Sequence, residues 1–260
     1  MIKEYFLQKK DIISMKSSSR GSQRKYFSEG YWYKEDSTGY EGESEYLVSK
    51  LLEYSNVQNF VRYERCLITV EGNTKFGSRS KNFLRDGQTF ITFQRLYEIY
   101  YGKNLADDIL GYYELSDRIK YVTDTMNKIT NCDCTVYLQQ ILSLDMIILN
   151  DDRHFHNLGY LQNEDGSFET APIFDNGRGL LSDVLIYPLD DSFDENKSKV
   201  IGCPFSGSLE MQAASVGINF DFDRVKFYEF LNREKNLTDL RFLRAYNTLE
   251  KQLGIYYPIK

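Results

Sequence analysis

The chain has 260 residues, of which 42% are hydrophobic and 15% aromatic, and its formal net charge is −6. This length and composition suit one large domain or two lobes with a substantial core. The balance of 38 acidic against 32 basic residues gives no reason to expect nucleic acid as the main partner.

The cysteines and the N-terminal sequence indicate in which cell compartment the protein is expected. Without a signal peptide, Cys66, Cys132, Cys134 and Cys203 are typical of reduced thiols and not of a disulfide framework. The opening stretch MIKEYFLQKKDIISMK is too charged for a secretory signal. No stretch approaches the roughly 20 apolar residues of a membrane span. We therefore expect a cytoplasmic protein without a membrane span, with export as an effector as the alternative.

The first hundred residues predict a mixed region of strands and one helix. A Ser/Gly-rich turn, SMKSSSRGSQRKYF, lies between extended stretches, and GYWYKED is typical of a short aromatic strand. The apolar residues of YLVSKLLE recur at helical spacing and predict a helix from about Glu43 to Tyr54. CLITV (66–70) and FITFQRL (90–96) predict two further strands, joined by a polar, Gly-containing connection.

From Leu105 onward the pattern becomes helical. LADDILGYYELSDRIKYVTDTMNK and CTVYLQQILSLDMIILN hold long apolar series with few helix-breaking residues. NLGYL and FETAPIFD then predict a hairpin around the turn NEDG. FDRVKFYEFLNR and LTDLRFLRAYNTLEKQLG predict two more helices, the second capped by Gly254. We expect an α+β fold in which a small mixed lobe precedes a larger helical lobe with one embedded hairpin.

A group of polar residues lies in NDDRHFHNLGYL, residues 150–161. Asp152 and Asn157 are five residues apart on a loop between a helix and the hairpin, and Asp175 follows at the expected end of the second hairpin strand. The hairpin is expected to bring these three side chains to one edge. Such hard oxygen ligands suit Mg²⁺ bound together with nucleotide phosphates. Phosphoryl transfer needs little more than an Asp at the attacking hydroxyl, metal ligands and a Lys on the phosphates.

The upstream region supplies a lysine and a carboxylate. Lys34 ends the aromatic strand, and Glu45 shares a helix face with Val48 and Leu52. Glu45 is therefore expected to point inward and to need a cationic partner, for which Lys34 is the nearest candidate. Glu41 and Glu43 are alternatives to Glu45. The small residues of SSSRGSQRK would let backbone N–H groups approach phosphate oxygens.

The order of these motifs resembles that of a known family. DDRHFHN followed by PIFDNG, with SSRGSQRK upstream, resembles the HipA-like serine/threonine kinases, and among them the compact CtkA-type kinases. The family pattern S-x-x-G-x-Q-x-K fits a phosphate loop of Ser18, Gly21, Gln23 and Lys25. The family pattern D-x-H-x-x-N fits Asp152, His154 and Asn157, and this register selects Asp152 over Asp151. The hydrophobic pair before the family's metal aspartate fits Ile173 and Phe174, followed by Asp175.

The resemblance implies a two-lobed protein-kinase-like fold, with an N-lobe over 1–80 and a C-lobe over 81–260. It implies that Asp152 is the catalytic aspartate and that His154 braces its loop. By the same resemblance, Asn157 and Asp175 would bind Mg²⁺, and Lys34, held by Glu45, would contact the ATP phosphates. The hinge that touches adenine would lie near Ser78 to Phe83.

The resemblance also implies ATP and Mg²⁺ as cofactors and a protein serine or threonine hydroxyl as acceptor, with autophosphorylation in the Ser17–Ser19 loop. Two features depart from the family. The chain lacks the N-terminal subdomain of the longer HipA toxins, which puts an antitoxin-like regulatory partner in doubt. The phosphate loop also has a single glycine and the bulky Arg20.

Other functions remain open. One alternative is a nucleotide-binding pseudokinase or regulatory module, and another is a kinase acting on a small-molecule or lipid hydroxyl. Metal-dependent hydrolysis by His154, His156 and the aspartates ranks below these, because the chain has only two histidines.

Overall fold

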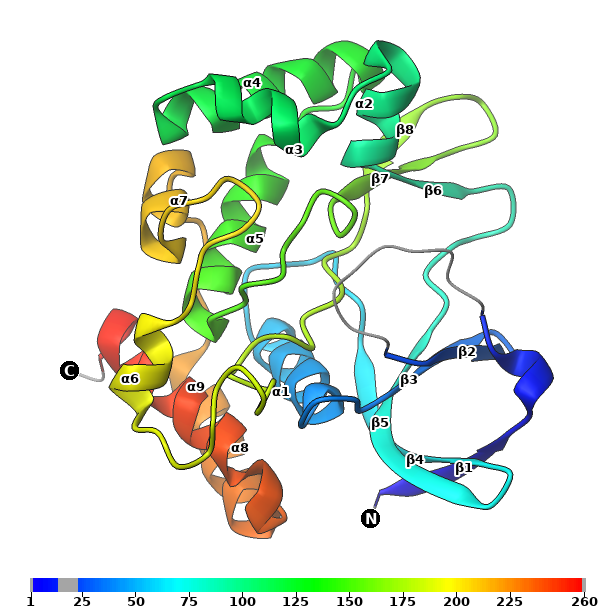
Figure 1. Cartoon of the computed structure of the whole chain (residues 1–260), viewed down its shortest axis with the longest axis vertical. Helices are drawn as coiled ribbons and strands as arrows, with labels where there is room; N and C mark the ends of the chain where they lie inside the picture. Colours follow the sequence, from blue (N-terminus) through cyan, green and yellow to red (C-terminus); the bar gives the residue numbers. More distant parts are fainter. Residues whose placement is uncertain (1, 14–22, 259–260) are drawn as a thin grey trace. The chain divides into compact units, whose positions relative to one another are not determined.

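The structure is a computed structural model, and it describes residues 2–13 and 23–258. It is of mixed α+β class, with a curled sheet in the N-terminal half and helices in the C-terminal region (Figure 1), so the expected class is confirmed. The chain forms two compact units. Unit 1 comprises Met1–Asn82, Asp175–Lys199 and Phe222–Lys260, and unit 2 comprises Phe83–Phe174 and Val200–Asp221. No helix within the described residues is long and apolar enough to cross a membrane.

Unit 1 contains a five-stranded sheet in the order β1-β4-β5-β3-β2. Its strands are β1 (Lys3–Leu7), β2 (Lys25–Ser28), β3 (Tyr31–Glu35), β4 (Tyr63–Val70) and β5 (Asn73–Lys81). Only the β1–β4 pair is parallel, and the register of β2 and β3 sets Lys25 opposite Lys34. The two central lysines of the expected site therefore come from neighbouring strands.

The prediction of a polar connection after residue 70 is wrong, because β5 occupies that range. Its buried positions are the small residues Gly77, Ser78 and Ser80, so the strand lacks the alternating apolar pattern that marks most strands. A tight turn at Glu71 and Gly72, both with positive φ, joins it to β4.

Helix α1 (Glu41–Glu53) lies beside β5 in unit 1 (Figure 1) and confirms the helix expected from about Glu43. Its apolar residues from Leu47 to Leu52 are buried. The helix approaches the sheet closely at Gly42, where an added Cβ would lie 2.4 Å from the carbonyl carbon of Gly77. Asp36, just after β3, accepts the Gly42 N–H at 2.6 Å and fixes the start of the helix.

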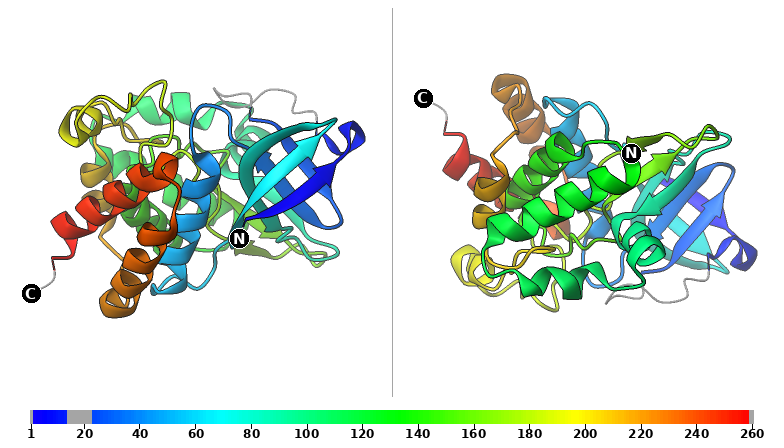
Figure 2. Two further views of the ribbon diagram at one scale, coloured as in Figure 1. Left: turned by 90° about the horizontal axis from the view of Figure 1, so that it is seen from below. Right: turned by 90° about the horizontal axis from the view of Figure 1, so that it is seen from above.

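Two C-terminal helices complete unit 1. They are α8 (Arg224–Leu237) and α9 (Leu243–Tyr256), and Figure 2 shows them next to α1. The Asp223 carboxylate begins α8 by accepting the Lys226 N–H at 3.1 Å. Gly254 was expected to end α9, but the helix continues two residues further. The space around Gly254 is open, so the glycine forces no turn at this position.

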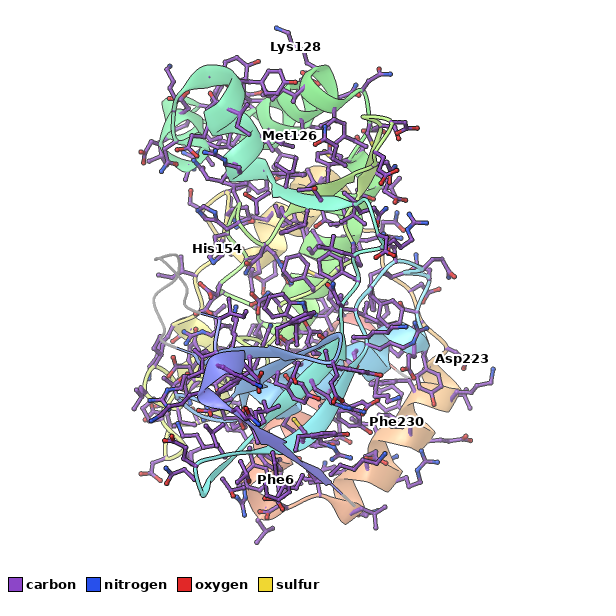
Figure 3. The ribbon with its side chains drawn as sticks, turned by 90° about the vertical axis from the view of Figure 1, so that its right-hand side faces the viewer. Phe6, Met126, Lys128, His154, Asp223 and Phe230 are labelled. Atoms are coloured by element: carbon purple, nitrogen blue, oxygen red, sulfur yellow. The ribbon has the colours of Figure 1, made fainter. Side chains whose placement is uncertain are left out.

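Unit 2 combines a small sheet with helices. Its elements include β6 (Thr89–Thr92), α2 (Phe93–Tyr101), α3 (Leu105–Asp108), α4 (Leu115–Thr130), α5 (Thr135–Ile148), β7 (Gly159–Gln162), β8 (Phe168–Thr170) and α7 (Leu209–Val216). The three strands pair in the order β6-β7-β8. On α4, Met126 lies on the buried face and Lys128 on the exposed face (Figure 3).

Three expectations for unit 2 are wrong in detail. FITFQRL is only half strand, because the Thr92 hydroxyl accepts the Arg95 N–H at 3.0 Å and starts α2 at Phe93. The helix expected from Leu105 is interrupted after α3 and resumes only at Leu115. The second hairpin strand ends at Thr170, so Asp175 lies beyond the strand and not at its end.

The close approach of α1 to β5 can be tested by adding one methyl group. Gly42→Ala should lower the free energy of unfolding by about 1–3 kcal/mol, because the backbone of β5 must move. Gly254→Ala is the matched control in open space, where removing a helical glycine should raise stability by about 0.5–1 kcal/mol. Urea denaturation measures both. A Gly42→Ala protein as stable as the unsubstituted chain would contradict the packing.

Candidate functional site

The centre of the site in unit 1 is the ammonium group of Lys34. Its Nζ lies 2.7 Å from Oε1 of Glu45 on α1 and 2.6 Å from Oδ1 of Asp175. Lys34 is 8% exposed and Glu45 is 1% exposed, so this ion pair is shielded from water. The lysine joins a strand, a helix and the segment after Phe174.

The neighbouring acids of α1 have other partners. The Glu43 carboxylate accepts hydrogen bonds from Arg65 at 3.2 Å and from the Tyr246 hydroxyl at 2.6 Å. The Glu41 carboxylate accepts the N–H of Thr38 at 2.8 Å. Among the three glutamates, Glu45 is therefore the one that contacts Lys34.

The charges in this cluster reinforce one another. Burial alone would lower the pKa of the Lys34 ammonium, but the carboxylates of Asp175 and Glu45 outweigh burial and hold that pKa well above 10.5. Burial raises the pKa of the Glu45 carboxyl, and Lys34 opposes this effect. One cation thus stabilises two carboxylates, and the lysine stays charged at any physiological pH.

The segment at Asp175 is fixed by backbone contacts. Asp175 has a left-handed backbone, with φ of 59°, and its N–H donates to the Tyr63 hydroxyl at 3.3 Å. The next N–H, of Asn176, donates to Oε2 of Glu45 at 2.9 Å. The Ser44 hydroxyl on α1 donates to the Asn176 carbonyl at 3.0 Å. Glu45 therefore holds Lys34 with one oxygen and the Asp175 turn with the other.

The expected phosphate loop is described only in part. Ser18, Gly21, Arg20 and the Ser17–Ser19 run lie outside the described residues, whereas Gln23 precedes β2 and Lys25 begins it. Lys25 Nζ lies 3.9 Å from Oδ2 of Asp175. A second lysine thus stands beside the same carboxylate as Lys34.

In unit 2 the expected catalytic loop is a series of tight turns. The His154 N–H donates to the Asp152 carbonyl at 3.0 Å, and the Asn157 N–H donates to the His154 carbonyl at 2.8 Å. Nδ2 of Asn157 also donates to the Asp152 carbonyl, at 3.3 Å. This contact uses the amide nitrogen of Asn157 and not its Oδ1, which is the atom that could bind a metal.

The two histidines lie close together without forming a recognisable metal centre. Their ring centroids are 5.6 Å apart, with the planes at 78°. Burial lowers the pKa of His156, and His154 contributes to the same effect. Within residues 2–13 and 23–258, no three or more His, Cys, Asp and Glu side chains are grouped so as to hold a metal ion.

Arg153 anchors the expected catalytic loop, and the sequence analysis did not identify it. Its side chain is fully buried, with Nε 2.9 Å from Oδ2 and Nη2 2.9 Å from Oδ1 of Asp145. Nη1 donates to the carbonyl of Phe174 at 2.6 Å. Phe174 is the residue just before Asp175. Asp145 is the lone carboxylate in the apolar stretch that forms α5, and a buried carboxylate needs a cation. That signal in the sequence could have identified the pair.

The donor atoms fit the chemistry of Mg²⁺ bound with phosphates. The Asp175 carboxylate and the Asn157 amide oxygen are hard ligands of the kind Mg²⁺ prefers. Lys34 and Lys25 beside Asp175 would balance the added negative charge of phosphate groups. Asp152 and Asn157 belong to unit 2 and Asp175 to unit 1, and the convergence of the three stays a prediction.

Comparisons with known proteins add one finding about the fold. No family model and no curated protein matches the chain. Among solved structures, the chain is similar to the crystal structure of a Helicobacter pylori proinflammatory kinase, CtkA, with a TM-score of 0.63 and 15% sequence identity. The match covers 98% of this chain and 94% of that chain. The chain therefore has a kinase-like fold over nearly its whole length.

The Arg153–Asp145 pair can be tested by measuring stability. Arg153→Met leaves the Asp145 carboxylate buried without its cation and should cost about 3–5 kcal/mol of unfolding free energy. Arg95→Met is the matched control, since Arg95 forms an exposed pair with Glu98 worth less than about 1 kcal/mol. Urea denaturation compares the two variants. Adding Asp145→Asn to Arg153→Met should recover part of the lost unfolding free energy. Equal losses for Arg153→Met and Arg95→Met would refute the buried Arg153–Asp145 pair.

Proposed function

We propose that the protein is an ATP- and Mg²⁺-dependent phosphotransferase, acting as a protein serine/threonine kinase in the cytoplasm. The observation that carries this proposal is the Lys34 ammonium bonded to both Glu45 and Asp175. Phosphoryl transfer depends on a lysine held at the nucleotide phosphates by a helix glutamate, together with an aspartate that binds the metal. The kinase-like fold supports the same activity.

Each residue has a role in this proposal. Lys34 binds ATP phosphates, Glu45 orients Lys34, and Gln23, Lys25, Ser18 and Gly21 belong to the loop over the phosphates. Asp152 orients the attacking hydroxyl and takes up its proton, while His154 and the buried Arg153 hold the loop that carries Asp152. Asn157 and Asp175 hold Mg²⁺, which when bound neutralises charge on the phosphate oxygens.

A nucleotide-binding pseudokinase is the second candidate, and Arg20 in a loop with one glycine is the feature that favours it. Against it stands the ion pair of Lys34 and Glu45, which is the arrangement that phosphoryl transfer requires. A small-molecule or lipid acceptor would use the same phosphate chemistry, and the resemblance of the motifs to protein kinases favours a protein acceptor.

Phosphate transfer from γ-labelled ATP to a lysate of the native cell tests the proposal. Asp152→Asn, Asp175→Asn and Lys34→Met should each lower the rate about 100-fold or more, since each removes a group that acts in the transfer. Asp124→Asn and Lys120→Met are matched controls at an exposed pair on α4 and should keep full activity. Retained labelling in Asp152→Asn and Asp175→Asn would reject the site, and nucleotide binding without turnover would favour the pseudokinase.

We further propose autophosphorylation within the Ser17–Ser19 loop. A phosphate there adds about −1.5 to −2 charges beside the incoming ATP phosphates and should weaken ATP binding. After incubation with Mg-ATP, intact-mass measurement should show added phosphate, and peptide mapping should place it between Met15 and Lys25. Asp152→Asn protein treated in the same way is the control. Absence of phosphate from that peptide in active protein would end the proposal.

A further inference from the structure

Unit 1 has a cavity that the kinase site does not use. Its volume is about 510 Å³, within the range of ligand sites. We call it the Tyr63 pocket. It is lined by residues of α1, β1, β4, β5 and the segment from α8 to Phe242, and its aromatic lining consists of Tyr46, Tyr63, Phe76 and Phe242.

Tyr63 connects this pocket directly to the kinase site. The residue is 4% exposed and lines the pocket, while its hydroxyl accepts the Asp175 N–H at 3.3 Å. The ring centroid of Tyr63 lies 5.3 Å from Nζ of Lys34, a distance at which a cation and an aromatic ring attract each other. A ligand that displaces Tyr63 therefore acts on both Lys34 and the backbone of Asp175.

Arg65 provides a second connection, through α1. Its guanidinium lies over the ring of Tyr46 at 4.1 Å and forms ion pairs with Glu43 at 3.2 Å and Glu234 at 2.8 Å. Glu43 and Tyr46 flank Glu45 on the same helix. Arg65 therefore links α1 to α8 across the wall of the pocket. A ligand that moves Arg65 would shift α1, the helix whose Glu45 contacts Lys34.

The surroundings of the pocket indicate what fits it. Leu237 in its lining is 76% exposed, so an apolar group of a partner would cover a large apolar side chain. The three acids of the lining, Glu64, Glu234 and Asp239, are each paired with an arginine. Lys3, also in the lining, forms no ion pair among the described residues and suits a carboxylate of a partner. Lys3 lies on β1, the outermost strand of the sheet, whose outer edge can bind an extended peptide.

We propose that the Tyr63 pocket is a regulatory site for a protein segment with an apolar anchor residue next to a carboxylate. Binding of this segment changes nucleotide affinity through Tyr63 and α1. The second half of the inference rests on the proposed function, since it requires that the site at Lys34 binds nucleotide.

A tethered group tests the connection. In a Cys132→Ser, Cys203→Ser background, Thr238→Cys on the pocket wall is modified with 2-phenylethyl methanethiosulfonate. The modification should change the Kd for Mg-ATP by about fivefold or more, the scale of allosteric coupling. Val225→Cys, 71% exposed on α8 and outside the lining, is the matched control and should show no change.

Hydrogen exchange distinguishes a failure of the connection between pocket and site from a failure of the proposed function. The Asn176 amide, bonded to Glu45, should exchange at a different rate once Thr238→Cys is modified. Unchanged exchange, or an unchanged Kd in protein that binds Mg-ATP, overturns the connection. If exchange changes but no protein binds Mg-ATP, the connection holds and the proposed function fails.

A random peptide library displayed on phage tests the kind of ligand. Selected peptides should share an aromatic or aliphatic residue next to Asp or Glu. Leu237→Asp and Lys3→Glu should each weaken their binding by about fivefold or more. Leu189→Asp, at a residue 62% exposed outside the lining, is the control and should leave binding unchanged. Peptides without this pattern, no selected peptide, or equal binding to Leu237→Asp would overturn the proposal.

Discussion

Unit 1 depends on a single cation shared between two carboxylates. The Lys34 ammonium joins β3 and α1, which follow one another in the sequence, to the distant segment at Asp175. Because Glu45 is almost fully buried, its charge would be costly without this partner. Two further contacts keep Glu45 near Lys34 and Asp175. Gly42 lets α1 approach the sheet, and Glu45 also accepts the Asn176 N–H. Packing and charge therefore hold these groups in one arrangement.

The sequence was sufficient to predict one partner of this cation, Glu45, but not its contact with Asp175 or the residues around the pair. Glu45 could be identified because it shares a helix face with Val48 and Leu52, and an inward carboxylate needs a cation nearby. Tyr63 could not be identified, since nothing in a strand sequence says that a tyrosine hydroxyl will meet a backbone N–H more than a hundred residues away. Arg153 was overlooked although it lies inside the quoted motif, because its partner Asp145 is hidden in an apolar helix.

The errors in the fold have local physical causes. The strand β5 was not predicted because its buried residues are small or polar and not apolar. Such residues are buried here because α1 packs closely on the strand, with Gly42 next to Gly77. The helix α2 was mistaken for strand because the Thr92 cap outweighs the β-branched and aromatic residues around it. In both places a specific contact decides the structure, and a periodic pattern does not report such contacts. The convergence of Asp152 and Asn157 with Asp175 is a question between the two units, and no local pattern decides it.

The left-handed backbone of Asp175 limits which residues evolution can place there. Only glycine, asparagine and aspartate adopt this conformation readily, because other side chains clash with the following carbonyl oxygen. This chain does place Leu149, Leu180 and Leu181 in the same region, at an energetic cost, so the set is a preference and not a strict limit. An inactive homologue is therefore expected to carry asparagine or glycine at this position, and seldom alanine or a branched residue.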